Sequence, residues 1–286
     1  MSVIEIKNDK LTVGINSIGS EILYIKGASG TDFLWNGDEN VWSGRAPVLF
    51  PICGGLKEDK YTFNGKKYSL PKHGFGRKSE FEGKLISDKK VEFILKSNEE
   101  TLKNYPFEFI LKIVFELEDN KIKVSNKVEN LSEGAMYFSI GAHEGYSCPE
   151  GIEEYYIEFD EEVTLDSFIL DGNLLENNSI RILDNQKKLP LKYEYFEIDA
   201  LVFKNVDFHK ATLKHKNSSK EIIVEFEDSE YFLLWTKPEA KYICLEPWNG
   251  IQDIVDSDYD ITKKEGIIEL EKGGMYEVSH TITFIE

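Results

Sequence analysis

The chain has 286 residues, a length that suits one large domain or two ordinary ones, and 41% of the residues are hydrophobic. Its 34 basic and 52 acidic residues give a formal net charge of −18. Because such a surface repels phosphate backbones and anionic lipids, we expect neither nucleic acid nor membranes as partners.

Polar and apolar residues alternate in short runs along the chain, and a period of two is typical of half-buried β-strands. The clearest run, residues 107–117, is followed by the turn residues Asp119-Asn120 and a second run at 121–128, which predicts a long antiparallel hairpin. Asn64-Gly65 predicts a tighter hairpin between residues 61–63 and 67–69. Further strands are expected at residues 11–15, 21–25, 91–95, 155–159, 222–226, 232–235, 242–245 and 276–285.

A short helix is expected at residues 98–104, before Tyr105-Pro106, because a proline disfavours helical geometry in the residue that precedes it. Residues 160–200 show no clear period and are expected to form loops. No linker or change of composition divides the chain. The sequence therefore predicts an all-β protein, a single domain over residues 1–286 built as a large antiparallel β-sandwich.

The cysteines and the N-terminus indicate a cellular compartment. Cys53, Cys148 and Cys244 are widely spaced and form no CxxC pair. The first residues lack the basic and apolar regions of a secretory signal, and no apolar stretch reaches the length of a membrane span. We expect a cytoplasmic protein.

Three segments carry side chains suited to acid–base chemistry: His73 in HGFGR, His143 in GAHEG and Glu246 in CLEPWNG. Small neighbours let a ligand approach closely, and apolar neighbours raise the pKa of a carboxyl group. Two imidazoles and one such carboxylate can move protons at neutral pH without a cofactor. The residues alone also allow purely structural roles. His73 could cap a turn, His143 could mark a tight bend, and Glu246 could be an ordinary paired carboxylate.

Four motifs in this order resemble the aldose 1-epimerase (galactose mutarotase) superfamily, and most closely its LacX-like branch. They are RAPVLFP at 45–51, HGFGR at 73–77, GAH at 141–143 and CLEPWNG at 244–250. The resemblance implies a β-supersandwich with an open cleft, and a reaction that interconverts the α and β anomers of a hexose. It implies no metal and no cofactor.

The resemblance also implies roles for individual residues. Glu246 matches the family's base, which removes the proton of the anomeric hydroxyl. His143 matches the acid that protonates the ring oxygen, and His73 the residue that orients or polarises this oxygen. The resemblance further implies sugar binding by Arg45 and Asp199. Side-chain chemistry alone suggests two more binding residues, Arg77 for a phosphate or sugar diol and Trp248 for the apolar face of a pyranose.

One departure from the family pattern follows the GAH motif, where Glu144-Gly145-Tyr146 replaces the usual proline and small residues. A carboxylate beside His143 either raises the pKa of this histidine or points to solvent on the opposite face of the strand. Both interpretations stay open at this point.

The sequence leaves open another substrate and two other classes of function. Residues 57–78 carry seven basic and two acidic residues, so a hexose 6-phosphate is the alternative substrate. A sugar-binding module that has lost catalysis, and a metal-dependent hydrolase with two histidines and one glutamate as ligands, are the other classes. The expected partner is a small sugar, and the expected state is a monomer or homodimer.

Overall fold

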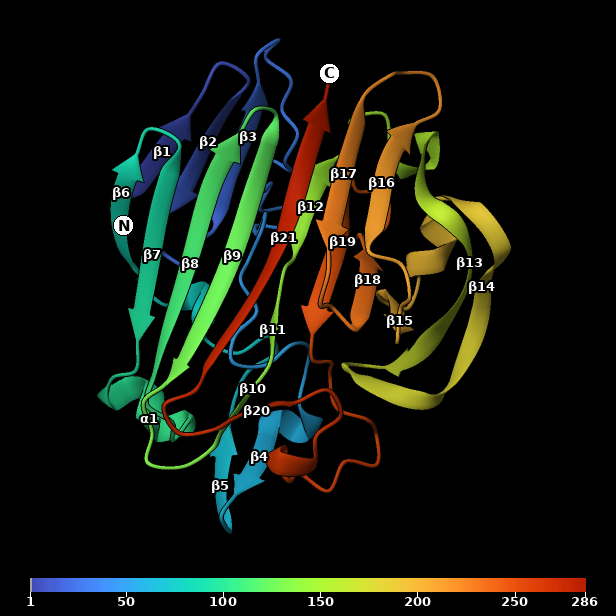
Figure 1. Ribbon diagram of the computed structural model, residues 1–286. Helices are drawn as coiled ribbons and strands as arrows, with labels where there is room; N and C mark the ends of the chain where they lie inside the picture. The colour runs from blue at the N-terminus through green and yellow to red at the C-terminus, as the bar shows by residue number, and fades with distance from the viewer. Residues whose placement is uncertain (1) are drawn as a thin grey trace.

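The computed structural model describes residues 2–286 and is dominated by two antiparallel β-sheets (Figure 1). Every pair of neighbouring strands in the larger, nine-stranded sheet is antiparallel. In order across the sheet its strands are β14 (Leu174–Pro190), β13 (Tyr155–Asp171), β16 (Lys210–His215), β17 (Glu221–Phe226), β21 (Met275–Ile285), β9 (Lys121–Asn130), β8 (Phe109–Glu118), β7 (Lys90–Lys96) and β6 (Glu82–Ser87).

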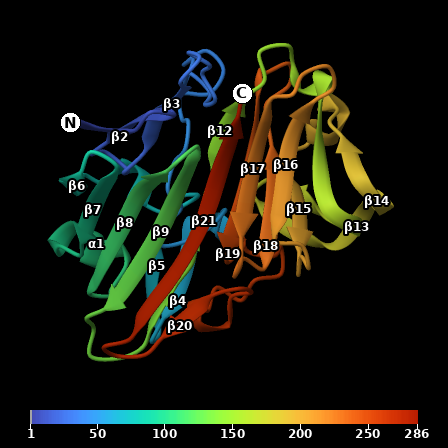
Figure 2. The ribbon, with the colours of Figure 1, turned by 45° about the horizontal axis from the view of Figure 1, so that its top comes forward.

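The smaller sheet contains the strands around which the candidate site is built. Its order is β11 (Ile140–Gly141), β19 (Tyr242–Asn249), β18 (Tyr231–Trp235) and β15 (Leu201–Lys204), and β12 (Glu144–Ser147) also pairs with β19. Both views place β18 and β19 behind β17 and β16 (Figures 1 and 2). Ile243 and Leu245 of the small sheet share one hydrophobic core with Val224 and Ile282 of the large one. The predicted all-β sandwich is therefore confirmed.

Smaller elements complete the fold. The remaining strands are β1 (Val3–Lys7), β2 (Leu11–Asn16) and β3 (Ile22–Gly27), the hairpin β4 (Lys60–Phe63) and β5 (Lys66–Ser69), and the pair β10 (Met136–Phe138) and β20 (Ile268–Leu270). The 3-10 helices are η1 (Lys57–Asp59), η2 (Gly76–Lys78), η3 (Ile152–Glu154), η4 (Tyr193–Phe196) and η5 (Ile261–Lys263). Within residues 2–286 no helix has the length and apolarity that crossing a membrane requires.

The expected short helix and both expected hairpins are present. Helix α1 (Glu99–Asn104) begins after Asn98, whose side chain accepts hydrogen bonds from the backbone N–H groups of Glu100 and Thr101. Strands β8 and β9 alternate between buried and more exposed residues, as their sequence period predicts. Asn64, in the tight turn between β4 and β5, has a φ of +50°, a conformation that asparagine tolerates.

The prediction that residues 160–200 form loops is wrong for most of this region. Strands β13 and β14 are 17 residues each and form a long hairpin at one end of the large sheet (Figure 1). Their pairing contains four register shifts, which break the period of two in the sequence. Much of β14 is also exposed, so few apolar residues mark a buried face. The hairpin turns at Gly172, whose φ is +59°.

Candidate active site

A pocket of about 260 Å³ lies beside the small sheet and contains most of the predicted site residues. This volume lies just below the roughly 300–1,000 Å³ of pockets for drug-sized ligands, so it suits a smaller occupant such as a monosaccharide. Segments far apart in the sequence form its wall, including the loop before β6 (Lys72, His73 and Arg77), the gap between β11 and β12 (His143), the tip of the β13–β14 hairpin (Leu170 and Asn173), and strands β18 and β19 (Leu233, Trp235, Glu246 and Trp248).

Strand alternation brings Glu246 into this pocket. Successive side chains of a strand point to opposite faces, so Ile243 and Leu245 enter the core between the sheets while Cys244 and Glu246 share the other face. Only 1% of Glu246 is exposed. Burial raises the pKa of its carboxyl group well above the usual value, because a low-dielectric environment disfavours the charged form.

His143 lies where the β-ladder of the small sheet is interrupted. Strand β19 pairs with β11 and with β12, and between these two strands residues 142–143 lie opposite Pro247 and Glu246. This gap in the regular ladder keeps one hydrogen bond, from the Ala142 N–H to the Pro247 carbonyl at 3.2 Å, while Pro247 has no N–H to donate in return. His143 thus lies directly across from Glu246.

The His143 ring and the Glu246 carboxyl group form a close, buried pair. His143 Nδ1 lies 3.5 Å from Glu246 Oε1, and Trp42 stacks on the imidazole at 5.3 Å between ring centroids. Burial lowers the pKa of His143 to about 3. Neither His143 Nδ1 nor Glu246 Oε2 has a hydrogen-bond partner among residues 2–286. The pair therefore has unused hydrogen-bonding capacity at the pocket.

His73 is held by the backbone of Gly54. Its Nδ1 accepts the Gly54 N–H at 3.1 Å, and its own backbone N–H donates to the Gly54 carbonyl at 2.8 Å. Because Nδ1 is an acceptor, the neutral ring carries its proton on Nε2. Burial, followed by the nearby His143, lowers the pKa of His73 well below its usual value. His73 is thus prepared to donate a hydrogen bond rather than to carry charge.

Two of the four predicted sugar-binding residues, Asp199 and Arg77, line the pocket with polar side chains. Asp199 Oδ2 and Lys72 Nζ are 3.4 Å apart, and both residues line the pocket. Arg77 lies next to them and donates from Nη2 to the Lys72 carbonyl at 3.1 Å.

The other two predicted binding residues are placed differently. The Arg45 guanidinium donates to the Asn36 carbonyl from Nε at 2.9 Å and Nη2 at 2.6 Å, and Arg45 is not part of the pocket wall. Trp248 is in the wall, but only 3% of it is exposed and its indole N–H donates to the Ala142 carbonyl. The half-buried Trp42 offers more ring surface, a role that the sequence did not suggest.

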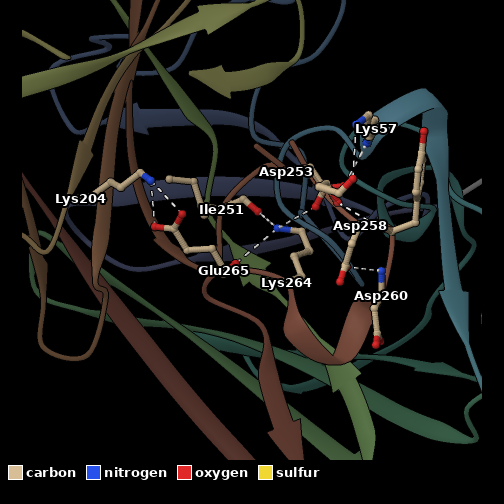
Figure 3. A network of polar contacts seen from close by, with 10 residues as sticks. Lys57, Lys204, Ile251, Asp253, Asp258, Asp260, Lys264 and Glu265 are labelled. Atoms are coloured by element: carbon tan, nitrogen blue, oxygen red, sulfur yellow. Dashed lines mark hydrogen bonds and ion pairs between the residues drawn. The ribbon is translucent and has the colours of Figure 1, made fainter. Parts of the chain in front are cut away.

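The loop after β19 forms another part of the pocket wall, and a buried lysine holds it in place. The sequence did not predict either feature. Gln252 lines the pocket, and its neighbours in the chain are Ile251 and Asp253. Lys264 Nζ donates to the Ile251 carbonyl and lies 3.9 Å from Asp253 Oδ1 (Figure 3). Asp253 Oδ2 also accepts the backbone N–H of Lys57 at 3.0 Å. Burial lowers the pKa of Lys264. These contacts fix the loop after β19 on both sides of Gln252.

The unusual Glu144 does not face the pocket. Its Oε1 lies 3.1 Å from His280 Nε2 of β21, so the side chain crosses the space between the two sheets. Both residues are about 95% buried. Neither interpretation left open by the sequence holds in full: the pKa of His143 is not raised, and Glu144 lies on the opposite face of the strand but in the core, not in solvent. His280 is the buried partner that Glu144 meets there.

One group of metal-ligand side chains occurs in the described part of the chain. His143, Cys244 and Glu246 each place one ligand atom within 4.8 Å of the others, and all three residues are buried. His73 is not part of this group. The third ligand type beside His143 and Glu246 is therefore a thiol, although the ring centroid of His73 also lies 5.5 Å from that of His143.

The chain is similar to known proteins over its whole length. A sequence profile of aldose 1-epimerases matches residues 2–282. The LacX protein of Lactococcus lactis is 33% identical over 296 aligned residues that cover 99% of each chain. The crystal structure of a galactose mutarotase related enzyme from Lactobacillus acidophilus is 32% identical, with a TM-score of 0.95 over 100% of this chain and 98% of that one. A galactose mutarotase-like protein from Lactobacillus casei is 27% identical, with a TM-score of 0.94 over 99% and 100%. The LacX-like resemblance is confirmed, and the chain belongs to the aldose 1-epimerase family.

Proposed function

We propose that this protein interconverts the α and β anomers of a hexose by acid–base ring opening at Glu246 and His143. The observation that carries the proposal is the 3.5 Å approach of His143 Nδ1 to Glu246 Oε1 in a buried pocket of monosaccharide size. Membership of the aldose 1-epimerase family supports the reaction class.

Ring opening needs two proton transfers. The hydroxyl at C1 loses its proton to Glu246, the O1 electrons form the carbonyl, the bond from C1 to the ring oxygen breaks, and the ring oxygen gains a proton from His143. After rotation about the C1–C2 bond, the reverse transfers close the ring on the other face. Each positioned proton transfer contributes about 10²–10⁴ in rate.

Glu246 and His143 together carry one proton. Ring opening removes it from His143 and leaves one on Glu246, and ring closure reverses this. With Glu246 raised and His143 lowered in pKa, the protein without substrate holds this proton on Glu246. A bound sugar shifts it to His143 when its hydroxyls donate to the unpaired Oε2, because hydrogen bonds to a carboxylate favour its charged form. The two groups then titrate as a coupled pair.

The other wall residues have supporting roles in this proposal. His73 donates from Nε2 to the ring oxygen or to a neighbouring hydroxyl, since its Nδ1 is occupied by the Gly54 N–H. Asp199 and Lys72 bind hydroxyls at the rim, and the rings of Trp42 and Trp235 cover the apolar face of the sugar.

Anomer-exchange NMR on a panel of free and phosphorylated aldoses tests the function. Fast exchange of at least one hexose by the wild type, and its loss in Glu246→Gln, are expected. Glu92→Gln, a strand glutamate that pairs with Lys112 in the large sheet, is the control and should exchange at the wild-type rate. Saturable hexose binding without any exchange would instead identify a non-catalytic sugar-binding module.

A hexose 6-phosphate is the second candidate substrate, and the cations at the pocket favour it. Lys72, Arg77 and Lys237 line the wall, and Arg77 Nε has no hydrogen-bond partner in the described chain. Of the basic residues between 57 and 78, the exposed Lys66 and Lys67 lie on β5, outside this wall. A phosphate-using enzyme should prefer glucose 6-phosphate to glucose at least tenfold in kcat/KM and lose this preference in Arg77→Ala. Equal use of both sugars would leave a neutral hexose.

A further inference from the structure

We infer that His143, Cys244 and Glu246 form a binding site for a thiophilic divalent cation such as Zn²⁺, and that an ion bound there blocks the acid–base pair. Binding is argued from geometry alone, while the inhibition rests on the proposed function. Cys244 has no part in ring opening.

The strand geometry explains why the three side chains meet. Cys244 and Glu246 are two residues apart on β19, so both side chains project from the same face of the small sheet. His143 comes from the gap in the neighbouring ladder. The resulting imidazole, thiol and carboxyl group are the ligand types that zinc takes in proteins.

The distances are close to those of a coordinated ion. Zinc bonds of about 2.0–2.3 Å in a tetrahedron separate two ligand atoms by about 3.3–3.8 Å. His143 Nδ1 and Glu246 Oε1 are 3.5 Å apart, and the sulfur completes a group whose atoms all lie within 4.8 Å. Side-chain shifts of about 1 Å are therefore enough to close the site. The fourth position faces the pocket, which His143 and Glu246 line.

The electrostatics also suit a divalent cation. On binding, the Cys244 thiol and the Glu246 carboxyl group release their protons to solvent, while His143 stays neutral. The two negative charges balance the ion, so no net charge remains in a site where all three residues are at least 92% buried. His143 Nδ1, which has no hydrogen-bond partner within residues 2–286, gains the ion as a ligand partner.

Cobalt spectroscopy on the full-length protein tests the binding, after treatment with a chelator. Titration with Co²⁺ should give one equivalent with a thiolate-to-cobalt absorption band. Cys244→Ala should lose this band and bind Zn²⁺ on the order of 100-fold more weakly. Cys148→Ala, which removes another buried thiol, is the matched control and should keep the band. A wild type without the band, or a band that persists in Cys244→Ala, would overturn the site.

A second variant and an activity measurement complete the test. If Cys244→Ala does not fold, Glu246→Gln must lose tight Zn²⁺ binding in its place. Zn²⁺ should slow anomer exchange in the wild type and in Cys148→Ala, whereas the ratio of rates with and without Zn²⁺ should approach one in Cys244→Ala. A metal-free wild type without any exchange would contradict the proposed function, and the cobalt band would still decide the site.

Discussion

Replacing Glu246 by glutamine is expected to remove activity and to stabilise the fold at the same time. The amide keeps the shape of the side chain but is not a base, so kcat should fall by about 10²–10⁴. One N–H of the new amide finds an acceptor, since the unpaired His143 Nδ1 lies 3.5 Å from the Oε1 position of Glu246. Sugar binding should therefore change much less than the rate.

The gain in stability follows from the direction in which burial moves the pKa. Burial raises the pKa of Glu246 in the folded state, so the unfolded chain loses this proton at a lower pH than the folded one. The contribution of Glu246 to wild-type stability is therefore lost as the pH rises from about 4.3, the pKa of an unfolded glutamate, through the folded-state pKa. A folded-state pKa that is higher by one costs about 1.4 kcal/mol of stability at neutral pH, or about 3 °C in Tm for a protein of this size.

Thermal unfolding across pH measures this effect. The difference in Tm between Glu246→Gln and the wild type should be small near pH 4 and should grow as the pH rises to 8. Glu92→Gln should show no such trend. A Tm difference that is the same at pH 4 and pH 8, or a variant that keeps the wild-type exchange rate, would refute the reasoning.

Three further predictions concern other buried polar groups. Lys264→Ala should destabilise the protein by about 3–5 kcal/mol in urea unfolding, because Asp253 stays buried without its cation, and Asp253→Asn in the same chain should restore part of the loss. The contribution of His143 to stability should fall by about 2 kcal/mol as the pH drops from about 6.5 to 5, because the unfolded chain takes up a proton that His143 does not, so the stability of the wild type relative to His143→Gln should fall by this amount. A double-mutant cycle on Glu144 and His280 should give a coupling of about 1–3 kcal/mol, and additive effects would show that their contact contributes nothing.

Local sequence patterns predicted the fold correctly where strands are regular and turns are tight. Strands β8 and β9 keep a strict period of two, and their turn at Asp119 has a φ of +52°, which the residue type allows. The β13–β14 hairpin was missed because bulges shift its period and solvent covers much of β14. Its Asp171-Gly172 turn was nevertheless readable as a hairpin signal.

The candidate site was predictable only in part, for a physical reason. Motif order placed His73, His143 and Glu246 together, but it gives no direction for a side chain in a loop. Arg45 follows the family motif, yet its guanidinium binds the Asn36 carbonyl, a contact set by the tertiary fold. The approach of Cys244 to His143 likewise depends on the ladder gap at Pro247 and has no signal in the local sequence.

Two adjacent residues, His143 and Glu144, place their side chains on opposite faces of the small sheet, one at the pocket and one in the core. Glu144 points into the core, where its Oε1 meets His280 at 3.1 Å while its Oε2 has no hydrogen-bond partner in residues 2–286. His143 points to the pocket, where its Nδ1 has no hydrogen-bond partner in the same residues. An unpaired buried polar atom costs about 1–3 kcal/mol, and only the atom at the pocket lies where a ligand can supply the missing partner. The polar atoms left open on the pocket side of this strand are therefore the ones that a sugar hydroxyl or a metal ion would engage.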